Sequence, residues 1–264
     1  MQWGKVSSFP AVYEELCVPG FFVRFSDALL EVADLRPGDR LLDVATGTGI
    51  VLRRAREREP GLERTTGLDL NPGMLAVARE ASPQGTEFVE GDAMSLPFAD
   101  GSFDLVTCQQ GLQFFPDRGL GLREFHRVLA SGGRTVVASW AEIETAPGYA
   151  AIADAMLEQL PNLVGAARNP FALHDPDELR TLLESAGFEE VSVERAEDEA
   201  RFASPAEFTR SYVDGSAVSV SLEDFPETTR AALRAEIVER VTLLAGDGPH
   251  ALPLVTNIAR GRKA

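Results

Sequence analysis

The sequence is poor in cysteine and has no long apolar run. Its 264 residues include two cysteines, Cys17 and Cys108, far apart and in neither a metal-binding nor a redox spacing. A chain of this length buries enough surface to fold without disulfides. Two isolated cysteines suit a reducing compartment, and we therefore expect the cytoplasm. The first residues lack the pattern of a signal peptide, and no stretch reaches the roughly 18 apolar residues of a membrane-spanning helix. We therefore expect no membrane association.

Positive charge is scarce as well. The chain has 25 Lys and Arg against 41 Asp and Glu, a net charge of −16. Nucleic-acid binding depends on clustered basic residues that neutralise phosphates, so this balance disfavours DNA and RNA as partners. The expected partner is a small molecule. The sequence does not define the oligomeric state.

Short apolar runs alternate with helical patterns from residue 40 onward. Segments of this kind predict parallel strands joined by helical crossovers, and so a doubly wound α/β sheet covered on both faces. The predicted strands are residues 40–45, 65–70, 86–90, 103–108, 134–140, 190–194 and 252–259. The predicted helices are residues 21–32, 50–59, 120–129, 179–186 and 228–244, with one more starting at Asn71-Pro72 and another at Ser204-Pro205. The pair Gly132-Gly133 is expected to end the helix of residues 120–129.

The division of the chain follows from this order. Residues 200–250 lie between two predicted strands of one sheet, which favours a helical insertion over a separate domain. We expect a single domain of residues 1–264, with an N-terminal helical cap (1–38), a core (39–200), a helical lid (201–250) and a last strand (251–264).

The chemical signal begins at the end of the first strand, where residues 43–49 read DVATGTG. Glycines at a strand-to-helix junction let the backbone approach a ligand, and the helix N-terminus supplies hydrogen-bond donors. Leu52 stands where a dinucleotide-binding fingerprint would have its third glycine, which disfavours a nicotinamide dehydrogenase.

Acidic residues follow three successive strands. Asp43 precedes the glycine turn, Asp69 ends the second strand, and Asp92 follows the third. A carboxylate at the second strand end can accept hydrogen bonds from ribose hydroxyls. Three carboxylates around one crevice would repel a pyrophosphate, so they favour a cationic nucleoside.

With these motifs the sequence resembles the class I S-adenosylmethionine-dependent methyltransferases, in particular the ubiquinone/menaquinone biosynthesis C-methyltransferase group. The motifs that carry the resemblance are LLDVATGTG (41–49), GLDLNPGML (67–75), EGDAMSLPF (90–98), FDLVTCQQGLQFFPD (103–117) and REFHRVLASGGR (123–134). The resemblance implies a Rossmann-like, mostly parallel, seven-stranded sheet with S-adenosyl-L-methionine as cofactor and S-adenosyl-L-homocysteine as product.

The resemblance also implies a set of cofactor-binding residues. Gly47 and Gly49 would pass beside the methionine part of the cofactor, with Asp43 organising its amino end and Asp69 on the ribose. The implied set is Asp43, Ala45, Thr46, Gly47, Gly49, Asp69, Leu70, Met74, Asp92, Ala93, Met94, Gln109 and Gln110. The chain departs from the family pattern at Ala45, where a glycine is usual. It departs again in Gln113-Phe114-Phe115, where many relatives have histidine, so no histidine base is carried over.

No general base is assigned from the sequence. His126 lies at the edge of an apolar helix face and is expected to be structural, and His250 is expected to be solvated in a loop. His174 precedes a helix cap between core and lid and is the one candidate catalytic histidine. Cys108 is expected to be a buried apolar residue. The three scattered histidines and two cysteines predict no metal site.

Aromatic residues concentrate in the predicted cap segments, which favours a sizeable apolar or aromatic small molecule, as in secondary metabolism. The candidate substrate-binding residues are Tyr13, Phe22, Gln113, Phe171, His174 and Tyr212. We expect methyl transfer to such a molecule, with the acceptor atom (O, N or C) left open. Two alternatives are a cofactor-binding but non-methylating enzyme such as a cyclase, and an inactive partner protein. The inactive partner is disfavoured because all of the cofactor motifs are present.

Overall fold

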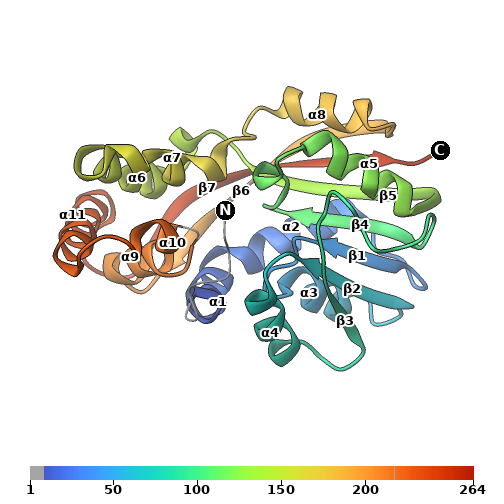
Figure 1. The fold of residues 1–264 in the computed structure, drawn as a ribbon, viewed down its shortest axis with the longest axis horizontal. Helices are drawn as coiled ribbons and strands as arrows, with labels where there is room; N and C mark the ends of the chain where they lie inside the picture. The colour runs from blue at the N-terminus through green and yellow to red at the C-terminus, as the bar shows by residue number, and fades with distance from the viewer. Residues whose placement is uncertain (1–8, 217) are drawn as a thin grey trace.

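One mixed sheet forms the centre of the computed structural model, which describes residues 9–216 and 218–264 (Figure 1). The seven strands lie in the order β3-β2-β1-β4-β5-β7-β6, and only β7 runs antiparallel to its neighbours. The strands are β1 (Arg40–Val44), β2 (Arg64–Asp69), β3 (Thr86–Glu90), β4 (Phe103–Gln109), β5 (Leu129–Trp140), β6 (Glu189–Phe202) and β7 (His250–Arg262). This confirms the predicted fold class.

The helices agree with the predicted ones to within a few residues, and several short ones are added. The helices are α1 (Phe9–Val12), η1 (Tyr13–Phe22), α2 (Val23–Ala33), α3 (Ile50–Arg58), α4 (Pro72–Ala81), η2 (Leu112–Phe114), α5 (Arg118–Val128), η3 (Ile143–Thr145), α6 (Pro147–Gln159), η4 (Pro161–Leu163), α7 (Val164–Arg168), η5 (Asn169–Phe171), α8 (Pro176–Ser185), α9 (Pro205–Val213), α10 (Val218–Leu222) and α11 (Glu227–Ala245). Asn71, Asp175 and Ser204 each accept a hydrogen bond from a backbone N–H of the helix that they precede, as N-caps do.

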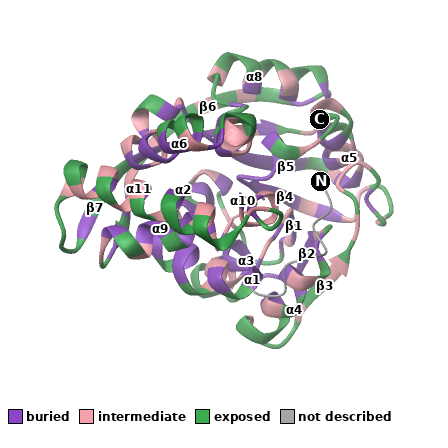
Figure 2. Ribbon diagram, turned by 60° about the vertical axis from the view of Figure 1, so that its left-hand side comes forward, coloured by how far each residue is buried: buried purple, intermediate pink, exposed green. Residues whose placement is uncertain are grey.

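Alternate residues of the strands pack on opposite faces of the sheet. Leu41 of β1 joins a core cluster with residues of α2 and α3, whereas its neighbour Leu42 joins a cluster with residues of α5 and α8. Val136 and Val137 of β5 divide in the same way. Figure 2 shows the result, with central strands coloured as buried and helices whose outer faces are exposed. Because successive side chains of a strand point to opposite faces, helices pack against both faces of the sheet.

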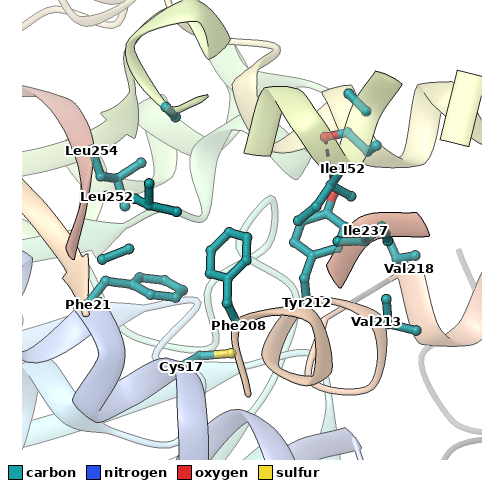
Figure 3. Close-up of a cluster of buried hydrophobic side chains, with 14 of the residues drawn as sticks. Cys17, Phe21, Ile152, Phe208, Tyr212, Val213, Val218, Ile237, Leu252 and Leu254 are labelled. Atoms are coloured by element: carbon teal, nitrogen blue, oxygen red, sulfur yellow. Dashed lines mark hydrogen bonds between the residues drawn. The ribbon is translucent and has the colours of Figure 1, made fainter. Parts of the chain in front are cut away.

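A second core lies beyond the sheet. Side chains of η1, α6, α7, α9, α10 and α11, the elements here called the cap, pack together with the ends of β6 and β7. Figure 1 shows α6, α7, α9, α10 and α11 gathered on the left of the view, away from β1–β4. In Figure 3, Phe21, Phe208 and Tyr212 lie among aliphatic side chains of this core, including Ile152 and Leu252. Helices α6 and α7 belong to residues that the sequence analysis placed in the core, yet they pack with α11 and α10.

One helix boundary was predicted wrongly. Helix α5 ends at Val128, not at Gly132-Gly133, because Leu129 already pairs with Phe103 of β4. The Lys263 ammonium donates to the carbonyl oxygens of His126 at 2.8 Å and Leu129 at 2.7 Å. A residue more than 130 positions away along the chain therefore completes this helix end, which local sequence could not indicate.

His250 was also predicted wrongly as a solvated loop residue. It is buried as the first residue of β7, with its ring 6.3 Å from the ring of Phe202 and 6.1 Å from that of Phe208. His126 is half-buried, with its ring 5.1 Å from that of Phe188. Burial lowers the pKa of His126, which favours its neutral form.

Candidate active site

A cavity of about 460 Å³ lies between the carboxyl ends of the parallel strands and the cap. This is the edge at which open α/β sheets bind ligands. Its wall on the strand side comes from the loops after β1, β2, β3 and β4, and its wall on the cap side from η1, α7, α9 and α10 with their loops. The volume lies within the range of small-molecule sites.

The loop after β1 has the backbone that its glycines allow. Gly47 has φ +57° and Gly49 has φ +84°, both in the left-handed region. A Cβ at Gly47 would stand 3.8 Å from the Tyr13 hydroxyl, and a Cβ at Gly49 would stand 3.1 Å from the Ser82 hydroxyl. Gly47 therefore leaves room on the cavity side of the loop, whereas Gly49 allows close packing beneath it.

Ala45 stands where the family pattern has its first glycine, and its methyl group affects both the backbone and a neighbouring loop. It has φ +56°, a strained value for a residue with a side chain. A Cβ at Gly111, in the loop after β4, would lie only 2.6 Å from the Ala45 Cβ. The alanine methyl group thus occupies space that Gly111 leaves free, and both residues line the cavity.

Asp69 connects the loops after β1 and β2. Its Oδ2 accepts the Gly47 N–H at 2.8 Å, and its Oδ1 accepts the Asn71 N–H at 2.8 Å. The side chain also lines the cavity. Burial raises the pKa of Asp69, while these backbone donors act against that shift. A ligand that donated hydrogen bonds here would further favour the ionised form.

Asp43 lies beneath the glycine loop and does not line the cavity. Its carboxylate accepts hydrogen bonds from the hydroxyls of Thr46 and Thr107, each at 2.7 Å. Burial raises the pKa of Asp43 to about 7, against the effect of these two donors. Three of the predicted cofactor residues do not line the cavity: Asp43, Thr46 and Gly49. Asp43 instead supports the glycine loop from below through its hydrogen bond with Thr46.

Asp43 should make the stability of the fold depend on pH. Its folded pKa of about 7 lies above the value of about 4 expected in the unfolded chain, so the folded state holds the proton more tightly. The stabilisation is complete below about pH 4 and is lost as the pH rises to about 7. Asp43 alone should lower the free energy of unfolding by at most about 1.4 kcal/mol per pH unit in this window.

Denaturant titrations at several pH values test this expectation. Asp43→Asn should reduce the slope of stability against pH, and Asp154→Asn, on an exposed position of α6, should keep the slope of the unchanged chain. Equal slopes in Asp43→Asn and the unchanged chain would contradict the assignment.

The remaining predicted cofactor residues lie along the same wall. Asp92 is exposed on the loop after β3, where its Oδ1 accepts the Met94 N–H at 2.8 Å. Met74 reaches the cavity from α4, and Leu70 lies at its edge, 55% exposed. The predicted cofactor residues that line the cavity are Ala45, Gly47, Asp69, Leu70, Met74, Asp92, Ala93, Met94, Gln109 and Gln110.

Aromatic side chains cover the cavity from the cap side. Five rings of the cap line it there: those of Tyr13, Phe21, Phe22, Tyr149 and Tyr212. Burial raises the pKa of Tyr13 and Tyr149 well above the ordinary tyrosine value and raises that of Tyr212 too. These hydroxyls are therefore neutral near pH 7 and can donate hydrogen bonds but not accept a proton.

Two predicted substrate residues lie outside the cavity wall. His174 is exposed, with Nδ1 3.0 Å from the carbonyl oxygen of Phe171. Phe171 is buried, but its ring packs 5.7 Å from that of Tyr149, behind the lining. The buried position next to His174 belongs to Leu173, which anchors the segment and leaves the histidine pointing outward. Tyr13, Phe22, Gln113 and Tyr212 do line the cavity.

Sequence reasoning missed several residues of the wall. Phe9, Phe21, Trp140, Tyr149 and Phe115 all line the cavity. Trp140 ends β5 at the same sheet edge as the acidic residues, and that position was the signal that could have identified it.

Over residues 9–216 and 218–264, no group of three or more His, Cys, Asp or Glu side chains is placed to hold a metal ion. Within those same ranges, no helix is long and apolar enough to cross a membrane.

Comparison with known proteins agrees with this geometry. The profile of a family described as "Methyltransferase domain" matches residues 42–137. A demethylmenaquinone methyltransferase of Thermus thermophilus is 45% identical over 121 residues, which cover 45% of this chain and 54% of that protein. A ubiquinone/menaquinone biosynthesis C-methyltransferase of Stenotrophomonas maltophilia is 38% identical over 175 residues, 60% of this chain and 68% of that protein. The chain thus spans about half the length of the first relative and two thirds of the second.

Solved structures share the fold. Haemonchus contortus phosphoethanolamine N-methyltransferase 2, in complex with S-adenosyl-L-methionine, matches with a TM-score of 0.63 at 19% identity, over 98% of this chain and 57% of that one. The [4+2]-cyclase SpnF matches with a TM-score of 0.55 at 21% identity, over 91% of this chain and 81% of that one.

Sequence identity over two thirds of a relative, together with the strand order and the glycine loop, defines the class. The chain belongs to the S-adenosylmethionine-dependent methyltransferase family that includes the ubiquinone/menaquinone biosynthesis C-methyltransferases. Its cofactor is S-adenosyl-L-methionine. The residues present fit this group, because Gly47 leaves space beside a carboxylate, Asp69, that faces the cavity.

Proposed function

We propose that this protein transfers the methyl group of S-adenosyl-L-methionine to a small, largely apolar or aromatic molecule. One observation carries the proposal: a single cavity is lined both by the glycine-loop residues with Asp69 and by the aromatic rings of the cap. A donor bound at the strand ends and an acceptor bound under the cap would share one enclosed space. The cytoplasm and secondary metabolism are parts of this proposal, supported by two free, buried cysteines and the apolar cap.

The residues of the chain would act mainly by binding and by excluding water. We assign the ribose to Asp69, the adenine to Leu70, Met74 and the Asp92 loop, and the amino acid part to the glycine loop and the backbone at Gln109-Gln110. When bound, the cofactor would supply a methyl group activated by its positively charged sulfur. Transfer of this kind depends on alignment and a dry site more than on covalent help.

The protonation states of the wall limit the acceptor. The titratable side chains that line the cavity, among the residues described, are Tyr13, Cys17, Asp69, Asp92, Tyr149 and Tyr212. Burial raises the pKa values of Cys17 and of the three tyrosines, so these four groups hold their protons. Asp69 and Asp92 belong to the cofactor end. The acceptor must therefore bring its own acidic proton, as a phenol or an enolisable carbon does.

A second candidate function is a cyclase or other enzyme that binds the cofactor without methyl transfer. The observation in its favour is this same shortage of a base in the described cavity wall. Mass spectrometry separates the two: methyl transfer adds one methylene mass to the acceptor, whereas a cyclase gives an isomer of unchanged mass.

The first test is a calorimetric titration of the purified protein with S-adenosyl-L-methionine, S-adenosyl-L-homocysteine and NADH. We expect the two adenosyl compounds to bind with dissociation constants in the micromolar range, which corresponds to a binding free energy of about −8 kcal/mol. We expect no binding of NADH. Binding of NADH alone would contradict the assignment of the glycine loop. Incubation with phenolic and enolisable acceptors then tests transfer by the mass gain.

A further inference from the structure

Tyr149 presents to the cavity a phenol hydroxyl that the protein itself does not use. The residue lies in the first turn of α6, is half-buried and lines the cavity. Its hydroxyl oxygen has no hydrogen-bond partner among the described residues, yet it is not one of the unpaired atoms that are enclosed without access to solvent. Buried tyrosine hydroxyls usually find a partner within the protein. This one is left accessible to whatever fills the cavity.

Ring packing fixes the place of this hydroxyl. The Tyr149 ring meets four other rings edge to face, with ring centres 6.2 Å away in Phe21, 5.7 Å in Phe171, 5.5 Å in Phe208 and 5.4 Å in Tyr212. All four of these residues are buried, so the accessible surface of Tyr149 faces the cavity and its ring has no room to turn away. The hydroxyl is therefore held in position before any ligand binds.

The backbone at Tyr149 is held independently of its hydroxyl. Its N–H donates to the Ala146 carbonyl at 2.9 Å, at the start of α6. A Cβ at the preceding residue, Gly148, would lie 2.7 Å from the Leu252 side chain and 2.8 Å from that of Phe208. Glycine thus lets the first turn of α6 lie close to β7 and α9. Neither contact involves the Tyr149 oxygen, so the fold does not depend on it.

Neighbouring hydroxyls on the cavity wall are used by the protein. The Tyr212 hydroxyl donates to the Ala167 carbonyl at 3.1 Å, and the Ser211 hydroxyl donates to the Phe208 carbonyl at 2.7 Å. Both side chains line the same cavity as Tyr149. Tyr149 differs from them because its hydroxyl remains free for a ligand.

Tyr13 also has a free hydroxyl, but at the cofactor end of the cavity. A Cβ at Gly47 would stand 3.8 Å from this hydroxyl, and the pKa of Tyr13 is raised by burial and then by neighbouring acidic groups that include Asp69. Burial also raises the pKa of Tyr149, with smaller contributions only from the thiol and the phenols of the same wall. A negatively charged ligand oxygen is thus repelled less at Tyr149 than at Tyr13.

The cavity wall leaves neutral donors to stabilise negative charge on an acceptor. No Lys, Arg or His side chain lines it within the part of the chain that the structure describes. A phenol or an enol becomes a good nucleophile when it loses its proton. A hydrogen bond from a neutral hydroxyl strengthens as the oxygen that accepts it becomes negative, and most of all in a site that excludes water.

We propose that Tyr149 is a catalytic residue, whose hydroxyl donates a hydrogen bond to an oxygen of the acceptor and stabilises the phenolate or enolate form of that oxygen. The proton of the acceptor passes to water, and its electron pair stays on the acceptor, shared between the oxygen and the conjugated carbon. Tyr149 keeps its own proton throughout. This inference rests on the proposed function and adds to it the group that binds the ionised oxygen.

The visible absorption of a bound phenol tests the inference without methyl transfer. The probes are 4-nitrophenol and the larger 4-nitro-1-naphthol, whose ionised forms absorb visible light, on protein saturated with S-adenosyl-L-homocysteine. A pH titration gives the pKa of each bound probe. In Tyr149→Phe we expect this pKa to be higher by about 1 to 2, a 10- to 100-fold loss of affinity for the ionised form. The methyl ethers of the probes cannot ionise and should lose about threefold in affinity or less.

Melting temperatures distinguish this role from a structural one. Tyr149→Phe keeps the ring and its four ring contacts, so it should melt at the temperature of the unchanged protein or above. Tyr212→Phe is the comparison, because it removes the hydrogen bond to Ala167 and should melt about 2 to 4 °C lower. A Tyr149 hydroxyl with only a structural role would lower the melting temperature and leave the pKa of the bound probes unchanged.

A titration with S-adenosyl-L-homocysteine separates the inference from the proposed function. If the protein does not bind it, the proposed function fails and the inference fails with it. If it binds, and the probes either do not bind or have the same pKa in Tyr149→Phe as in the unchanged protein, only the inference fails. An unchanged affinity of Tyr149→Phe for S-adenosyl-L-homocysteine, together with the raised pKa of the bound probes, supports both.

Discussion

Replacing Asp69 by alanine is expected to weaken the binding of S-adenosyl-L-homocysteine by about 1 to 3 kcal/mol, roughly 5- to 150-fold in the dissociation constant. The carboxylate is a hydrogen-bond acceptor on the cavity wall, and it also holds the N–H groups of Gly47 and Asn71 at 2.8 Å each. The variant removes the group that we assign to the ribose and releases the glycine loop from the loop after β2. Isothermal calorimetry measures the change.

A neighbouring carboxylate supplies the control. Glu90 is the exposed last residue of β3, pairs with Asp69 in the sheet register, and does not line the cavity. Glu90→Gln removes the same charge from the same sheet edge and should leave the dissociation constant within about twofold, since exposed charges contribute little. Equal losses in the two variants would show that general electrostatics, and not contact with Asp69, governs binding. An unchanged constant in Asp69→Ala would show that the residue was misassigned.

The sheet and the cofactor wall could be predicted because their signals are local. Each parallel strand shows as an apolar run, and its carboxyl end has a fixed place in a doubly wound sheet. The sequence alone thus predicts that Asp69 and Asp92 lie at one edge of the sheet. Ala45 could be recognised as standing where the family pattern has a glycine, but its strained backbone and its close fit to Gly111, 66 positions away in another loop, have no local signal.

The cap and its contribution to the cavity were harder to predict because they depend on long-range packing. Tyr149 lies on α6, which the sequence places in the core, yet its ring is 5.4 Å from that of Tyr212 on α9. Helix periodicity indicates that such a helix has an apolar face, but not which partner covers it. His174 lies outside the cavity wall for a related reason: it is exposed, whereas Leu173 beside it is the buried residue of this segment.

Replacing Arg134 by methionine is expected to destabilise the fold by about 3 to 5 kcal/mol, the range for breaking a buried ion pair. The Arg134 side chain is 5% exposed and that of its partner Asp39 is 8% exposed. Its guanidinium also donates to the carbonyl oxygens of Ala33 at 2.7 Å and Asp34 at 2.6 Å, at the end of α2. The variant therefore leaves the buried Asp39 carboxylate without its ion-pair partner. It also removes the two hydrogen bonds that cap the C-terminus of α2. Chemical denaturation measures the loss.

The half-exposed pair of Arg40 and Asp104 provides the comparison. Their side chains are 31% and 32% exposed, with Nε and Oδ2 2.8 Å apart. Arg40→Met should cost about 1 kcal/mol or less, because water solvates the carboxylate that remains. The double variant Asp39→Asn/Arg134→Met should recover part of the loss of the single variant, since it no longer buries a lone charge. Equal losses for Arg134→Met and Arg40→Met, or no recovery in the double variant, would mean that packing and not the unpaired carboxylate sets the cost.

In either case the cavity lies at the opposite ends of the strands, so the folded fraction of Arg134→Met should bind S-adenosyl-L-homocysteine with unchanged affinity.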